Sequence, residues 1–216
     1  AAFLREVSAL IRNGNAQGIA QRMRLSSNDS SKKQYVDSLA TKLYPAASGE
    51  CERQISGDWA EVVCHACLAA SKQKLGKLEE AFKHQEAAVE AFLRVFKTLT
   101  RPWLPVFYAL LVDLRRVASE ADTQAREAVG GVPNEAGCLE AAGRVMRKCL
   151  AHELRDEESD KDVSRSWGAL FVANQCNKIF FRLNTLKHVK SLVLPPIVGI
   201  DEYPLADRIT WRFFQG

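Results

Sequence analysis

The chain has 216 residues, 47% of them hydrophobic and 26% charged, which is ordinary for a soluble globular protein and allows one sizeable core or two small ones. The net charge of +4 permits contact with nucleic acid or an acidic partner but does not require it. No apolar run approaches the roughly 20 residues of a membrane-spanning helix, and the early charges of Arg5 and Glu6 argue against a secretory signal peptide.

The first part of the chain, residues 1–43, is predicted to hold short helices and a mobile polar loop at residues 26–33. We therefore distinguish an N-terminal region, residues 1–50, from a helical-repeat region, residues 51–216.

The repeat region opens with a predicted helical hairpin. Apolar residues recur at steps of three and four on two successive stretches, which is the spacing of one buried face per helix. Gly76 lies between them and suits the left-handed position that ends a helix. So short a turn forces the two helices to pack antiparallel. The two faces comprise Trp59, Val63, Ala66, Ala70 and Leu78, Phe82, Gln85, Val89, Phe92, Phe96, Leu99.

The pattern then repeats towards the C-terminus. Pro102 ends the second helix, and Pro105 lies in the first turn of the third, where its missing N–H costs nothing. Gly130-Gly131-Val132-Pro133 breaks the third helix, and Asn134 caps the fourth. The later predicted segments are a third helix over 104–129, a fourth over 135–154, an acidic linker over 156–162, a fifth helix over 164–183, a short sixth over 186–194 that Pro195-Pro196 ends, and a last helix over 207–214.

Successive hairpins of roughly 40 residues, without a convincing strand, predict an all-α fold. In such a fold each hairpin buries its apolar face on the next. The expected architecture is an α-solenoid of tetratricopeptide-like helical hairpins.

Cysteine and histidine residues offer the first candidate chemistry. Cys64-His65-Ala66-Cys67 has the spacing of half a zinc site, but the four ligands of a structural site need a second such pair, which the sequence lacks. We expect both cysteines to pack in the core, because free cysteine behaves there as a small hydrophobic residue. Without a secretory signal, we expect a reducing intracellular compartment, in which the thiols stay free. His84 is expected on a solvent-exposed polar face. The six cysteines are Cys51, Cys64, Cys67, Cys138, Cys149 and Cys176.

The motifs of catalysis are absent from the sequence. It contains no nucleophile elbow, no glycine-rich phosphate loop and no His-Glu-x-x-His helix. We therefore predict no enzymatic activity, no catalytic residues, no metal site and no cofactor.

Basic residues on two predicted helices are candidates for nucleic-acid contact. Arg144, Arg147 and Lys148 share one face of the fourth helix, and Lys178 and Arg182 share one face of the fifth. A phosphate-binding surface would use such residues, and its affinity would fall steeply with salt. The alternative is that they are solvated helix faces.

Polar residues within apolar helices are interpreted as structural. Asp113 could pair with Arg116 or with a cation of the adjacent hairpin, and Asn174 could bond to backbone groups between hairpins, because buried polar groups need partners.

Three segments then carry a resemblance to a known family. The third predicted helix reads Leu-Pro-Val-x-Tyr-Ala with a later Asp-Leu-Arg and Ala-Asp, and the fifth reads Trp-Gly, Asn, Lys-x-x-Phe-Arg and Asn-x-Leu. From Trp59 to Gly216 the chain resembles the helical-repeat part of the PCI proteins that serve nuclear mRNA, above all the small PCI subunit of the transcription-export complex. The matching residues are Leu104, Pro105, Val106, Tyr108, Ala109, Asp113, Leu114, Arg115, Ala121, Asp122, Trp167, Gly168, Asn174, Lys178, Phe181, Arg182, Asn184, Leu186 and the aromatic C-terminal segment 208–216.

Two departures leave the subfamily open. Ser166 replaces a second basic residue before Trp167, and Asn177 stands where the family has an aromatic residue. The alternative within the family is a close paralogue that is named from the signalosome and linked to splicing and transcription, or a lid subunit of proteasome type.

The resemblance implies a right-handed superhelix that leads into a C-terminal winged helix, which is expected to lie outside this chain. It implies a nuclear, and also cytoplasmic, scaffold that couples transcription to mRNA processing and export. The implied partners are a larger GANP-type PCI scaffold, a small acidic disordered subunit of the Sem/Dss type bound through the winged helix, and RNA or DNA in the full-length protein. No membrane contact is implied. A generic tetratricopeptide-like peptide-binding module is the alternative from a different class.

Aromatic residues of the last helix are the candidate partner-binding residues: Trp211, Phe213 and Phe214. Trp211 or Phe214 should be exposed in this chain, since each would otherwise pack towards the winged helix. Exposed aromatic side chains there would favour self-association.

Overall fold

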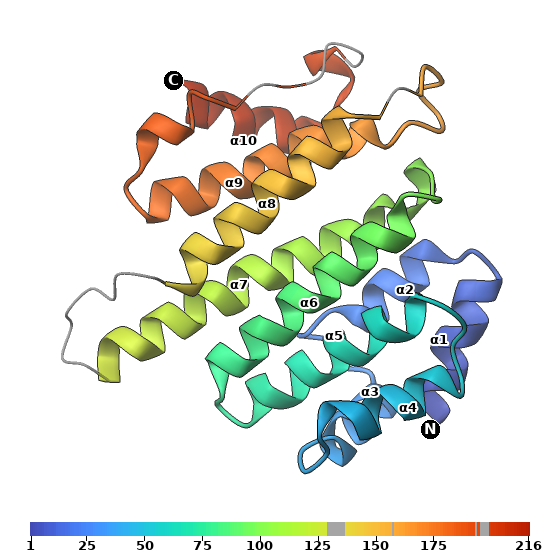
Figure 1. The fold of residues 1–216 in the computed structure, drawn as a ribbon. Helices are drawn as coiled ribbons and strands as arrows, with labels where there is room; N and C mark the ends of the chain where they lie inside the picture. The colour runs from blue at the N-terminus through green and yellow to red at the C-terminus, as the bar shows by residue number, and fades with distance from the viewer. Residues whose placement is uncertain (129–136, 157, 193, 195–198) are drawn as a thin grey trace.

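The computed structural model describes residues 1–128, 137–156, 158–192, 194 and 199–216. Within those ranges the secondary structure is helical, and no strand is present (Figure 1). No helix in the described ranges is both long enough and apolar enough to cross a membrane. The α-helices are α1 (Ala2–Arg12), α2 (Ala16–Met23), α3 (Ser30–Ser38), α4 (Tyr44–Glu52), α5 (Trp59–Lys74), α6 (Leu78–Phe96), α7 (Leu104–Ala128), α8 (Cys138–Leu154), α9 (Ala169–Arg182) and α10 (Leu205–Gln215).

The helices stack as successive hairpins. Helix α5 packs on α6, α6 on α7, α8 on α9 and α9 on α10, and Figure 1 shows these helices lying side by side. Gly76 adopts φ +74°, and the next N–H, of Lys77, bonds to the Lys72 carbonyl at 2.9 Å, so a left-handed glycine ends α5 as predicted. The all-α solenoid of helical hairpins is confirmed.

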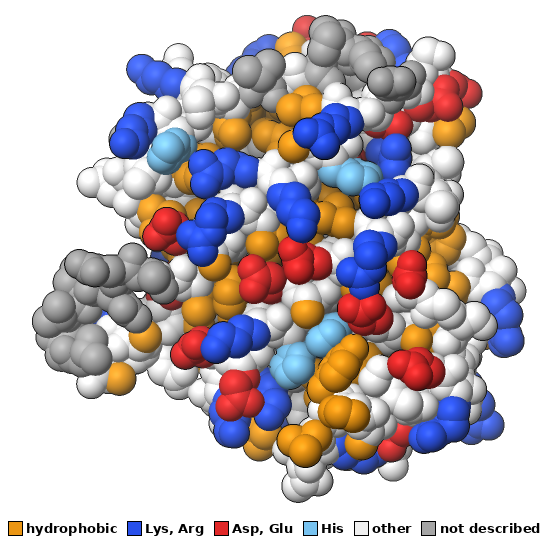
Figure 2. All heavy atoms as spheres, viewed as in Figure 1, with side chains coloured by type: hydrophobic (Ala, Val, Ile, Leu, Met, Phe, Trp, Pro, Cys, Tyr) orange, Lys and Arg blue, Asp and Glu red, His pale blue; other side chains and the backbone are white. Residues whose placement is uncertain are grey.

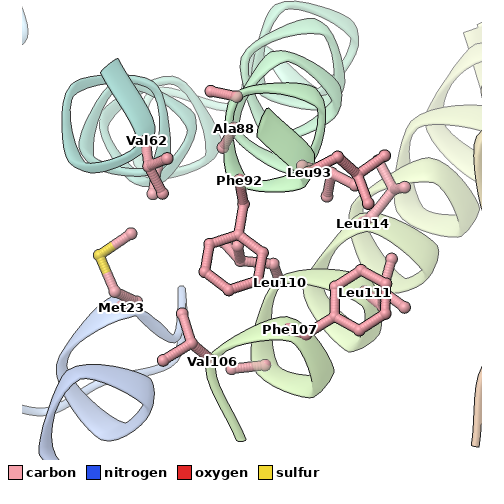
Figure 3. Packing of buried hydrophobic residues seen from close by; sticks show 14 of the residues in the cluster. Met23, Val62, Ala88, Phe92, Leu93, Val106, Phe107, Leu110, Leu111 and Leu114 are labelled. Carbon is pink, nitrogen blue, oxygen red and sulfur yellow. The ribbon is translucent and has the colours of Figure 1, made fainter. Parts of the chain in front are cut away.

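One apolar core runs through the stack and includes the N-terminal helices. Met23 of α2 points towards Val62 of α5 and Phe92 of α6, and the α7 residues Val106 and Leu110 lie beside them (Figure 3). The predicted boundary at residues 50 and 51 falls inside α4, and the core is continuous across it.

The polar segment 26–33 differs from the predicted mobile loop. Asp29 caps α3 by accepting the Lys32 N–H at 2.8 Å, and residues from Ser30 onwards are helical. The Lys32 side chain is only 2% exposed, and its Nζ donates to the Met23 and Arg24 carbonyls at 3.0 and 2.6 Å. Because these carbonyls end α2, where the helix dipole is negative, an ammonium can be buried there.

Helix α8 begins at Cys138, and a distant carboxylate caps it. Asp122 of α7 accepts the Cys138 N–H at 2.6 Å on Oδ1 and the Leu139 N–H at 3.0 Å on Oδ2. The predicted break at 130–133, the predicted cap Asn134 and the end of the third predicted helix at Val129 lie outside the described residues. A carboxylate of the preceding helix, α7, therefore accepts hydrogen bonds from the first two backbone amides of α8.

The segment after α9 contradicts the sixth predicted helix. It holds only a 3₁₀ turn, Leu186–His188, followed by turns, and Val189 is the one buried side chain described between 187 and 192. A segment with one buried residue gains too little packing to offset helix nucleation. Pro195-Pro196 lies outside the described residues.

The fifth predicted helix divides into a 3₁₀ turn, Arg165–Gly168, and α9. Asn184 follows α9 with φ +54°, and the Thr185 N–H bonds to the Phe180 carbonyl at 2.8 Å. The Asn-x-Leu segment therefore ends a helix, in a left-handed conformation that asparagine tolerates.

Gly168 provides a test of hairpin packing. A Cβ at this position would lie 2.5 Å from the buried Glu153 Oε2 and 2.9 Å from Leu104 Cδ2. We expect Gly168→Ala to lower the free energy of unfolding by about 1–3 kcal/mol, because a well-packed site has no room for an added methyl. Urea denaturation measures it. Gly49→Ala is the matched control, since its nearest contact is 4.0 Å away, and it should be neutral or stabilising by up to about 1 kcal/mol. Equal effects of the two variants would contradict this packing.

Candidate interaction surfaces

The Cys-His-Ala-Cys segment is divided between the core and a histidine pair. Cys64 and Cys67 are buried in the core, whereas His65 faces His84 with 3.0 Å between the two Nδ1 atoms. Among the described residues, no group of three or more histidine, cysteine or carboxylate side chains is arranged to hold a metal. The two cysteines therefore pack as small hydrophobic residues.

His84 differs from the predicted exposed histidine. It is half-buried and faces His65, on which Tyr44 stacks at 4.6 Å between ring centroids. Burial and the neighbouring His65 lower the pKa of His84 to about 4, and burial also lowers the pKa of His65. Both rings are therefore neutral at pH 7, and one can donate to the other.

The polar residues of the sequence motifs hold the hairpins together. Asp113 accepts the Leu25 N–H at 2.8 Å, and no ion pair within 4.0 Å joins it to Arg116, the first of the two pairings that the sequence left open. The N-terminal region packs over α7 and brings a backbone amide to this carboxylate instead. Asn174 behaves as predicted: its Nδ2 donates to the Asp207 carbonyl at 2.9 Å and links α9 to α10.

Glu153 is a buried carboxyl that the sequence pattern did not reveal. Its side chain has no exposed surface, and neither of its oxygens has a hydrogen-bond partner in the described part of the chain. His152 Nδ1 lies 3.5 Å from Glu153 Oε1. Burial raises the pKa of Glu153 to about 7, and the neighbouring His152 opposes this shift only in part.

The candidate basic residues of α8 are engaged within the molecule. Arg144 pairs with Glu140 at 3.3 Å, and Lys148 pairs with Glu90 of α6 at 2.9 Å. The Arg147 guanidinium lies over the Phe180 ring, 5.7 Å from its centroid. Figure 2 shows that Asp and Glu side chains lie among the Lys and Arg side chains on this face.

A groove of about 640 Å³ lies on the α6–α8 face. Two further cations of the groove are partnered: Arg94 pairs with Glu61, and Arg165 pairs with Asp156 at 3.0 Å and donates to the Phe96 carbonyl. Among the described residues, no ion pair within 4.0 Å holds Lys97 or Arg155, which also line the groove. The groove is lined by Glu90, Leu93, Arg94, Lys97, Lys148, Ala151, His152, Arg155 and Arg165.

The candidate basic residues of α9 lie on a different surface, next to two arginines of α7. Arg182 Nη2 donates to Thr123 Oγ1 of α7 at 3.4 Å, and Arg115 Nε donates to Gln175 Oε1 of α9 at 3.0 Å. Arg116 lies beside Arg115, and Lys178 lies one turn before Arg182. The predicted set of five basic residues is therefore split, and the structure adds Arg115 and Arg116 to its second half.

The last helix has two apolar sides. Trp211 and Phe214 are half-buried: Trp211 packs against Leu170 and Tyr203, and Phe214 meets Phe181 of α9 edge-on at 5.9 Å. Phe213 is 70% exposed and is the aromatic residue of α10 that projects furthest into solvent. With residues four and eight positions earlier it forms an exposed stripe, the α10 stripe, which comprises Leu205, Ile209 and Phe213.

Comparison with known proteins found relatives that include PCI domain-containing protein 2 and CSN12 homologues. PCI domain-containing protein 2 of Danio rerio is 32% identical over 141 residues, which cover 63% of this chain and 35% of that protein. The CSN12 homologue of Mycosarcoma maydis is 31% identical over 163 residues, 67% of this chain and 35% of that protein. The CSN12 homologue of Yarrowia lipolytica is 24% identical across 100% of this chain and 53% of its own length.

The chain thus spans about a third to a half of the length of these relatives. No family model matches the sequence, and no solved structure matches it.

The buried carboxyl of Glu153 predicts a pH dependence of stability. Its folded-state pKa of about 7 lies above the ordinary glutamate value of 4.5, so between these pH values the folded state binds more protons than the unfolded state. The free energy of unfolding should therefore fall as pH rises through this interval. Glu153→Gln should match wild type near pH 5 and exceed it above pH 7 by up to about 3 kcal/mol in urea denaturation.

Glu140→Gln on the exposed side of α8 is the matched control and should keep the wild-type dependence on pH. A Glu153→Gln profile that runs parallel to that of wild type would show that this carboxyl does not titrate in the interval.

Proposed function

We propose that this chain, which belongs to the PCI-domain family of PCI domain-containing protein 2 and the CSN12 homologues, is the helical-repeat part of a non-enzymatic scaffold subunit. In this proposal the full-length protein acts in the nucleus, with access to the cytoplasm, and couples transcription to mRNA processing and export. Its partners are a larger GANP-type PCI scaffold and a small acidic disordered subunit of the Sem/Dss type, the latter bound through a winged helix.

The observation that carries the proposal is the exposed α10 stripe. In a solenoid, the outer face of a terminal repeat is polar unless another unit covers it. Leu205 and Ile209 are 62% and 59% exposed, and Phe181 of α9 extends the apolar surface beside them. Contiguous apolar surface of this kind marks a protein–protein contact. The stripe lies at the end of the stack where the resemblance places the winged helix and the larger scaffold.

The use of the buried polar groups supports a non-enzymatic role. Asp113 and Asp122 accept backbone amides, and Asn174 donates to a backbone carbonyl. A catalytic carboxylate must instead reach a substrate within hydrogen-bond distance. These residues act as connectors between helices.

A second assignment within the family is the CSN12-like paralogue. It is favoured by the CSN12 homologue of Mycosarcoma maydis, whose identity to this chain is close to that of the Danio rerio protein. Both assignments describe a scaffold subunit and differ in the complex that it joins.

Co-expression with a GANP-type scaffold fragment tests the proposal. Size-exclusion chromatography with light scattering should show a stable one-to-one complex with the wild-type chain. Ile209→Asp with Phe213→Asp should abolish it, because two charges would be buried without partners in the contact. The double variant should also reduce any self-association of the chain alone.

The matched control places the same charges on exposed leucines outside α10, Leu43→Asp with Leu75→Asp. This variant should keep the complex. Separate elution of the wild-type chain and the scaffold, or loss of the complex in both variants, would contradict the assignment of the partner surface to α10.

A further inference from the structure

Four cations of α7 and α9 gather on one surface of the stack. Arg115 and Arg116 project from α7, and Lys178 and Arg182 project from α9 one helical turn apart. Two contacts between the helices place them together, Arg115 Nε to Gln175 Oε1 at 3.0 Å and Arg182 Nη2 to Thr123 Oγ1 at 3.4 Å. The cluster formed by Arg115, Arg116, Lys178 and Arg182 is the α7–α9 basic cluster.

No carboxylate in the described part of the chain lies within 4.0 Å of these four cations. Glu120 and Glu127 of α7 and Asp207 of α10 are the carboxylates of this region, and Glu120 is engaged by Gln73 at 2.8 Å. The cluster therefore differs from the α8 residues Arg144 and Lys148, each of which has an ion-pair partner.

The cations of the cluster repel one another. Burial lowers the pKa of Arg115, and the neighbouring Arg116 and Arg182 lower it further. The pKa of Lys178 is lowered by burial and by Arg115. Like charges that are partly removed from water raise the free energy of the folded state, and a bound anion would relieve this repulsion.

The surface also has room for an anion. A hollow of about 590 Å³ lies where α7, α9 and the start of α6 meet, and it is lined by Arg115, Arg116 and Arg182 together with Glu120 and Glu127 of α7. The planar guanidinium group donates two parallel hydrogen bonds to a phosphate, which makes arginine well suited to phosphate recognition.

An exposed aromatic side chain adjoins the cations and narrows the choice of ligand. Phe181 lies on α9 three residues after Lys178, is 57% exposed, and meets Phe214 of α10 edge-on at 5.9 Å between ring centroids. Single-stranded nucleic acids bind where a track of cations follows the backbone and aromatic rings stack on the bases. An acidic peptide would use the cations but has no need of the ring.

We infer that the α7–α9 basic cluster binds the phosphates of a single-stranded nucleic acid and that Phe181 stacks on one of its bases. The α8 residues Arg144, Arg147 and Lys148 do not take part. This inference goes beyond the scaffold role and does not rest on it.

Fluorescence anisotropy with a labelled oligouridylate of about 20 nucleotides tests the inference on the complete chain. The wild-type affinity should fall with salt, with a slope of log K against log salt near about −3 for four phosphate contacts. Arg116→Gln with Arg182→Gln should weaken binding about tenfold or more and reduce the magnitude of the slope by about 1.4. Phe181→Ala should weaken binding by about fivefold or more and leave the slope unchanged.

Arg144→Gln with Lys148→Gln is the matched control, because it removes the same charge from exposed residues of α8. Its affinity should equal that of wild type. Equal loss of affinity in the two double variants would mean that binding depends only on net charge, and it would contradict the proposed site. A polyglutamate peptide that competes as well as unlabelled oligouridylate would overturn the choice of ligand.

Discussion

The apolar face of a helical hairpin can be buried only against another hairpin, because two amphipathic helices by themselves leave one side in water. Every larger feature of this chain depends on that constraint. It makes the core continuous from Phe3 of α1 to Val189 after α9. It also leaves the last helix with an outer face that no described residue covers, and that face is the α10 stripe.

Close stacking of hairpins buries backbone groups that water can no longer satisfy, and a few side chains of one hairpin serve the backbone of another. Asp122 of α7 caps α8, and Asp113 holds the amide of Leu25 in the N-terminal region. Asn174 of α9 donates to a backbone carbonyl of α10 and so links these two helices. Since an unpaired buried polar group is costly, these residues determine how the helices fit together. This explains why these motif residues of the sequence are polar.

The arrangement of charge follows from the same stacking. On the α6–α8 face, cations of one helix meet carboxylates of its neighbours, as Lys148 meets Glu90. On the surface formed by α7 and α9, arginines of two helices meet one another and Gln175 or Thr123 instead. The α8 cations Arg144 and Lys148 are therefore neutralised within the molecule, whereas the α7–α9 basic cluster retains charge that an external partner can use. The apolar α10 stripe and the α7–α9 basic cluster meet at Phe181, so a protein partner and a nucleic acid could be held side by side.

The sequence by itself determined the helices and their buried faces, because a periodicity of three and four residues is local and needs no knowledge of neighbours. Gly76, Pro105 and the apolar stripe of α6 were read from it, as was the role of Asn174. The predictions for the polar segment around Lys32 and for the segment after α9 were wrong. Around Lys32, burial against other helices outweighed the local propensity for a loop. After α9, too little burial was available to stabilise the predicted helix.

Only the tertiary structure decided which charged residues are free. Lys148 and its partner Glu90 lie 58 residues apart, and helical spacing carries no information at that range. The five candidate basic residues look equivalent in the sequence. Arg144 pairs with Glu140 of its own helix, but packing between helices sets Lys148 against Glu90 and Arg147 over Phe180, and it leaves those of α9 beside Arg115 and Arg116. Contacts between helices cannot be read from the spacing of residues within one helix.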